Sequence, residues 1–192
     1  MVPKAEIAHW LAGSAVLLLG LVLLSEAIVG TEVFRRRRWR AYLWPSLALV
    51  GGVLLWVIVA FSTFSTMHLL AHAVWAQVAM VAGAVQLAIV RGKLASPRWP
   101  LVISVGLLLC GTAFVVHEQN DWLYSRAAFL HHALGWTLIV AAIFPLGQAF
   151  WPRRTVFQAG FALTFVAVAV LLFADRDVAP IFGHLSDTAG GR

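Results

Sequence analysis

The sequence predicts an all-α protein that spans a membrane as a bundle of six helices, with both chain ends outside the cytoplasm. Of the 192 residues, 61% are hydrophobic and 11% are charged, whereas soluble domains are roughly 45–50% apolar and about 25% charged. Six apolar runs approach the roughly 20 residues that a spanning helix needs. Lysine and arginine cluster in every second loop between these runs, as is typical of loops on the cytoplasmic side.

The six runs account for nearly the whole chain, so we expect a single integral membrane domain over residues 1–192. The first run is expected to stay uncleaved, because cleavage after Ser25-Glu26-Ala27 would export the arginines that follow. Pro145 is expected to kink the fifth span, because proline interrupts helical hydrogen bonding. A short external tail, 175–192, follows the last span. The predicted spans are 7–30, 42–63, 67–90, 100–116, 127–151 and 156–174.

The basic residues define the predicted orientation. Ten of the fourteen lie in the loops after the first, third and fifth spans, which the positive-inside bias places in the cytoplasm. We therefore expect a protein of the prokaryotic inner membrane, surrounded by the lipid bilayer. Nucleic acid is not an expected partner, because these residues lie in short loops and not on a folded basic face. The ten residues are Arg35, Arg36, Arg37, Arg38, Arg40, Arg91, Lys93, Arg98, Arg153 and Arg154.

The histidines all fall on the side opposite to these loops. Histidine is costly inside a bilayer and usually faces the bundle interior or a partner. From the helical rise, one of them lies roughly 7 Å below the outer boundary and two lie roughly 10 Å below it. We expect one polar site near the extracytoplasmic surface. The seven are His9, His68, His117 and His184, with His72 at the shallower of these depths and His131 and His132 at the deeper.

A first interpretation of this pattern is a haem b site. Haem b held by two imidazoles needs one histidine from each of two facing helices at equal depth, and His72 and His131 meet that requirement. His132 points about 100° away from His131, so we expect one of the two to be a ligand and the other a neighbour. Gly135 is expected to clear space for the macrocycle and Arg126 to bind its propionates. The protein would then pass electrons from quinol or another membrane redox complex.

Copper or zinc is the competing interpretation, because imidazole suits both metals. His68 and His72 lie one turn apart on one helical face. One or two further ligands, drawn from His117, Glu118 and one of the paired histidines, such as His131, would complete a site of three or four. The same histidines also suit a metal-free proton relay. A further alternative is a non-catalytic subunit of a membrane complex, whose histidines serve as interfacial anchors.

Histidines near the extracytoplasmic surface, on tryptophan-containing spans, resemble those of b-type membrane cytochromes and of bacterial CopD-type copper proteins. The resemblance rests on His72, His131 and His132 and covers about half of the chain. It implies a histidine-held haem in the first case and bound copper in the second.

Other polar and small residues inside the spans carry structural expectations. Glu26 is expected to face the bundle, because a lipid-exposed carboxylate is costly. Four glutamines are expected to form hydrogen bonds between helices, namely Gln77, Gln86, Gln148 and Gln158. Close helix contacts are expected at Gly51-Gly52, Gly83 and Gly111.

Overall fold

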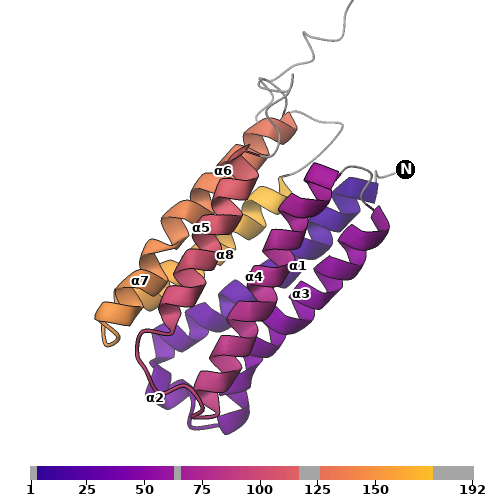
Figure 1. The fold of residues 1–192 in the computed structure, drawn as a ribbon. Helices are drawn as coiled ribbons and strands as arrows, with labels where there is room; N and C mark the ends of the chain where they lie inside the picture. Colours follow the sequence, from indigo (N-terminus) through magenta and orange to yellow (C-terminus); the bar gives the residue numbers. More distant parts are fainter. Residues whose placement is uncertain (1–3, 63–65, 117–125, 175–192) are drawn as a thin grey trace, which may run out of the picture.

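A computed structural model of the chain describes residues 4–62, 66–116 and 126–174. Within these ranges the regular structure is helical throughout, and the helices run up and down as one elongated bundle (Figure 1). Every element can be followed there from the indigo N-terminus to the yellow end of the last helix. The elements are α1 (Lys4–Val29), α2 (Thr31–Phe34), the short 3-10 helix η1 (Arg38–Tyr42), α3 (Leu43–Ser62), α4 (Thr66–Val90), α5 (Pro100–Val116), α6 (Arg126–Ala141), α7 (Ile143–Phe150) and α8 (Thr155–Phe173).

The outer surface of this bundle is apolar, as a lipid-embedded protein requires. Large side chains point outward from the middle of the helices, such as Leu54 and Leu109, which are 56% and 58% exposed. A continuous apolar surface of this kind is not tolerated in water. The integral membrane class is therefore confirmed, and five segments are long and apolar enough to cross: Ile7–Val29, Arg38–Ala60, His72–Val90, Phe129–Phe150 and Thr155–Phe173.

The remaining apolar helix, α5, is shorter than these five. It has 17 residues, which at 1.5 Å per residue gives about 25 Å, slightly less than the hydrocarbon core of a bilayer. It packs against α4 on one side and α6 on the other. A sixth crossing through α5, and the orientation of the bundle, stay predictions.

Two glycines with positive φ end helices at the same end of the bundle. Gly30, with φ of 87°, separates α1 from α2. Gly92, with φ of 70°, follows α4, where its N–H donates to the Ile89 carbonyl and the Lys93 N–H donates to the Ala88 carbonyl. This pair of bonds is a Schellman motif, which favours glycine at the left-handed position. Each turn therefore reverses the chain sharply.

The loops around these turns and the loop after α7 gather at the lower end of Figure 1, marked by the labels α2 and α7. The ten basic residues of the three loops lie here, whereas Lys4 and Arg126 begin α1 and α6 at the opposite end. We call this the arginine-rich end. The opposite end, where α4 and α6 begin and α5 finishes, carries His72, His131 and His132 and is called the histidine end.

The predicted kink at Pro145 is confirmed as the break between α6 and α7. Proline lacks an N–H, and its ring crowds the carbonyl four residues earlier, that of Ala141. The hydroxyl of Ser104 on α5 donates to the next carbonyl, that of Ala142, at 2.5 Å. The Ala142 carbonyl also accepts from the Leu146 N–H at 3.3 Å, so the hydroxyl is a second donor there, and it connects α5 to the break.

Close contact between helices depends on glycine, as is common in membrane bundles. A Cβ added to Gly52 or Gly83 would lie 2.8 or 2.6 Å from a carbonyl oxygen of the facing helix, where α3 meets α4. Gly111 and Gly135 face each other between α5 and α6, and a Cβ on either would lie 2.6 or 2.8 Å from the other's carbonyl. The predicted contacts at Gly52, Gly83 and Gly111 are confirmed. Gly51 borders open space, so that part of the prediction is wrong.

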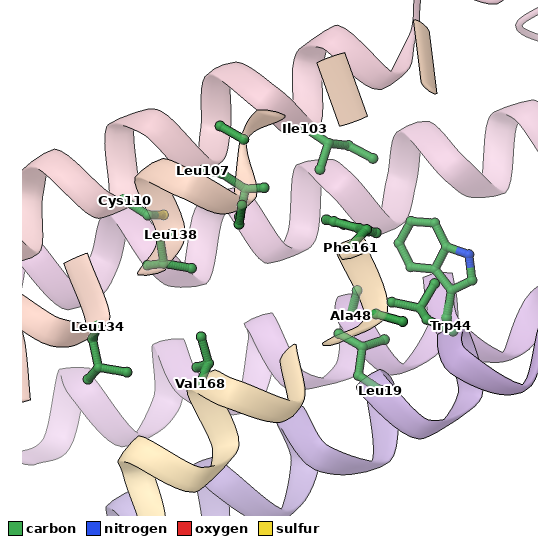
Figure 2. Packing of buried hydrophobic residues seen from close by; sticks show 14 of the residues in the cluster. Leu19, Trp44, Ala48, Ile103, Leu107, Cys110, Leu134, Leu138, Phe161 and Val168 are labelled. Atoms are coloured by element: carbon green, nitrogen blue, oxygen red, sulfur yellow. The ribbon is translucent and has the colours of Figure 1, made fainter. Parts of the chain in front are cut away.

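The bundle centre is filled by apolar side chains from five helices. Leu138 of α6 and Val168 of α8 are almost wholly buried, at 1% and 0% exposure. Figure 2 shows Cys110 and Leu107 of α5 on the same side of the cluster as Leu138. At the other side of the view, Leu19, Ala48, Trp44, Phe161 and Ile103 continue the core toward the arginine-rich end.

Replacing Gly111 by alanine should destabilise the bundle. The added methyl group would meet the Gly135 carbonyl at 2.6 Å and the Ile139 backbone nitrogen at 2.9 Å, and overpacking of this kind costs about 1–3 kcal/mol. Gly51→Ala is the matched control, because nothing lies within 4 Å of its added Cβ. Thermal unfolding in detergent should show a lower Tm for Gly111→Ala only. Equal Tm values for the two variants would contradict the helix contact.

Candidate functional site at the histidine end

Three helices bring aromatic side chains together at the histidine end. His72 lies in the second turn of α4, His131 in the second turn of α6, and Phe114 near the last turn of α5. Because α5 runs opposite to its two neighbours, its final turn lies beside their first turns (Figure 1). Side chains between 17 and 59 residues apart in sequence thus supply one cluster.

The rings of this cluster are in mutual contact. The imidazole centroids of His72 and His131 are 6.5 Å apart, with an interplanar angle of 82°. Phe114 stacks on His131 at 5.7 Å and meets His72 edge-on at 5.9 Å. Trp75, one turn after His72, contacts the same phenyl ring at 5.5 Å. Contact between the two imidazoles requires that they lie at the same depth in the bundle, as the sequence predicts. The role of the two histidines as ligands stays a prediction.

The separation of the two imidazoles can be compared with metal ligation. Ring centres of two imidazoles bound on opposite sides of one metal lie about 6.5 Å apart, and those of two ligands at a tetrahedral angle about 5 Å apart. The observed 6.5 Å between His72 and His131 agrees with the opposed arrangement. Opposed imidazoles from separate helices are the axial arrangement of a haem with two histidine ligands.

Phe114 limits what else the site accommodates. Its centroid is nearly equidistant from the two imidazoles, so it lies close to the plane midway between them. A porphyrin held by both histidines would occupy that plane. The separation of the two imidazoles is therefore compatible with a haem, whose macrocycle would fit only if the phenyl ring turned aside. A single metal ion between the imidazoles needs no such movement.

The expected role of Gly135 is corrected by the structure. Gly135 was expected to clear space beside His131 for a macrocycle, and instead it packs against the Gly111 carbonyl and the Val115 side chain of α5. A glycine lets two helix backbones approach as readily as it leaves space for a ligand. Here Gly135 lets the backbones of α5 and α6 come into contact.

Several predicted site residues lie outside the part of the chain whose side chains are described. His117 and Glu118 follow α5, while His68 in α4 and Arg126 at the start of α6 are placed by their backbone alone. His132 is half-buried beside His131, and the ring contact with His72 belongs to His131. Among the described residues, no three histidine, cysteine, aspartate or glutamate side chains gather closely enough to hold a metal ion.

Sequence reasoning did not include Phe114 in the site. Its position three residues before His117 places it at the same depth as the other rings. This depth is the one sequence feature that could have indicated Phe114 as a site residue. The direction in which the phenyl ring points depends on how α5 is rotated about its axis, which the uniformly apolar sequence of α5 does not reveal. The histidine pair, in contrast, was expected because buried imidazoles require partners.

Comparison with protein-family models, with curated proteins and with solved structures finds no match to this chain.

Removing the ring of Phe114 should loosen the cluster. Phe114 is 7% exposed and contacts His72, His131 and Trp75, so Phe114→Ala should lower the free energy of unfolding by on the order of 3 kcal/mol. Phe129→Ala is the control, because that ring is 47% exposed on α6. Thermal unfolding in detergent compares the two variants. A smaller loss for Phe114→Ala than for Phe129→Ala would show that Phe114 is not part of a packed cluster.

Proposed function

We propose that this protein is a membrane electron-transfer component related in design to b-type cytochromes, with a haem b bound by His72 and His131. The protein crosses the membrane six times, with α5 as one crossing, and the histidine end faces the extracytoplasmic side. Haem b supplies one-electron exchange when it is bound. Quinol, or another redox complex in the same membrane, is the proposed electron donor.

The observation that carries this proposal is the distance of 6.5 Å between two imidazoles on separate helices. A haem needs only two protein ligands, because the porphyrin supplies the other four nitrogens. The described residues offer these two ligands, which is the number that a haem requires. Trp75 and Phe114 provide the apolar surroundings in which a macrocycle is stable.

A copper or zinc site is the second candidate, and one observation favours it. The phenyl ring of Phe114 fills the plane in which the macrocycle would lie, whereas a bare ion needs no such space. His72 and His131 would then be joined by His68, His117 or Glu118, which lie on the same helix or just beyond α5. Such a protein would capture metal at the histidine end.

The visible spectrum of the purified protein tests the ligand assignment. Reduced protein should show haem α-bands, and His72→Ala and His131→Ala should each remove them, because haem b has no covalent link to the chain and is lost with an axial ligand. His132→Ala is the matched control and should keep the bands. Bands that survive in both ligand variants would contradict the assignment. Stoichiometric copper or zinc without porphyrin, found by elemental analysis, would favour the second candidate.

Enlarging Phe114 distinguishes a haem from an ion. Phe114→Trp adds a second ring in the plane between the imidazoles, so it should lower haem occupancy at least tenfold and leave the occupancy of a bare ion within about twofold. Haem and metal contents are measured together, by pyridine haemochrome spectra and elemental analysis. Full haem occupancy in the Phe114→Trp protein would place the macrocycle elsewhere.

A further inference from the structure

A second polar site lies at the arginine-rich end, inside the bundle and remote from the histidines. Glu26 of α1 is only 7% exposed, which confirms the prediction that it faces the bundle. Its carboxylate accepts a hydrogen bond from Nε of Arg35 at 2.8 Å. The turn at Gly30 allows the chain to fold back so that these two residues meet.

A cavity of about 70 Å³ borders this ion pair. One part of its wall is apolar and includes Trp44, Ile103 and Phe161, which lie together in Figure 2. The other part is polar and consists of Glu26, Arg35, Gln86, Gln148 and Gln158. Three carboxamides and an ion pair thus meet in the interior of a membrane bundle, where polar groups are costly unless they are hydrogen-bonded.

The glutamines are only partly satisfied by the protein. Gln148 donates to the Phe157 carbonyl at 3.2 Å, and Gln158 donates to the Thr31 hydroxyl at 3.4 Å, so the predicted bonds between helices are confirmed for these two. Gln86 has no hydrogen-bond partner among the residues that the structure describes. Its half-buried carboxamide has two donors and an acceptor, which are available to water in the cavity.

The size of the cavity decides what those partners are. A water molecule takes up about 30 Å³ of liquid, and a dry apolar cavity of about 150 Å³ accommodates benzene. The cavity at Glu26 therefore has room for about two water molecules and is too small for an aromatic or quinone ring. Water also needs two to four polar partners, and the polar wall supplies them. Arg35 is 34% exposed, so the cavity wall continues to the aqueous surface.

We propose that this cavity is a water-filled inlet, defined by Glu26, Arg35, Gln86, Gln148 and Gln158, that opens at the arginine-rich end. Water molecules complete the hydrogen bonds of Gln86 and solvate the Glu26–Arg35 pair inside the bundle. Small water-soluble species reach Glu26 by this route. The inlet does not depend on a cofactor at the histidine end.

Thiol labelling tests the inlet in the full-length protein, in lipid nanodiscs, after Cys110→Ala has removed the native thiol. Gln86→Cys places a thiol in the cavity wall. Ala84→Cys is the matched control, because position 84 is exposed about 200° around the same helix and faces lipid. The probe is the silver ion, a water-soluble cation about as small as a water molecule that binds ionised thiols, and its reaction is followed by the thiols left for maleimide labelling in SDS. We expect Gln86→Cys to react at least tenfold faster than Ala84→Cys.

A second variant controls for any change in the cavity that is caused by removing the Gln86 carboxamide itself. Ala27→Cys also lines the cavity, keeps all five polar residues and should react at a similar rate, while size-exclusion chromatography confirms that each variant is folded. Rates for positions 86 and 27 no higher than that of position 84 would show a dry cavity and overturn the proposal. Reaction of these two positions with N-phenylmaleimide alone, a lipid-soluble reagent, would show an opening to lipid and would also overturn it.

Discussion

The free-energy cost of a polar group in hydrocarbon determines where the polar side chains of this protein lie. Backbone groups are satisfied within helices, and next to the break at Pro145 the Ser104 hydroxyl, itself buried, donates to the Ala142 carbonyl. Ionisable side chains follow the same rule. The arginines stay in loops at one end, Glu26 is buried against Arg35, and the imidazoles of His72 and His131 face each other.

The same constraint explains how the bundle is assembled. Lipid tails are as apolar as the helix surfaces, so helices associate through close packing and hydrogen bonds and not through the hydrophobic effect. Gly52, Gly83, Gly111 and Gly135 let backbones approach. Close approach at Gly135 also limits the space beside His131. Helix packing therefore limits the space for the proposed haem at the histidine end, and its macrocycle would have to displace the Phe114 ring rather than separate α5 from α6.

The cost of polar groups in the membrane is also what made part of the structure predictable from sequence. The helical class, the inward position of Glu26 and the depth shared by His72 and His131 follow from residue type and helical rise alone. Phe114 could not be placed, because an apolar residue carries no such penalty on any face of α5. The hydrogen bond from Arg35 to Glu26 was not predicted. These residues are nine positions apart and meet because the chain turns at Gly30, and helical periodicity does not indicate the direction of that turn.

Helix α4 connects the two polar sites and shows how they are separated. His72 and Gln86 are fourteen residues apart on it, which corresponds to about 21 Å along the axis. Between them, Ala76 is fully buried and Gly83 packs against α3, so the buried face of α4 is apolar and closely packed there. Water in the proposed inlet is therefore not continuous with the histidine cluster along this helix. If the proposed haem is bound by His72 and His131, charge that compensates its reduction has no hydrated path along α4 from the arginine-rich end.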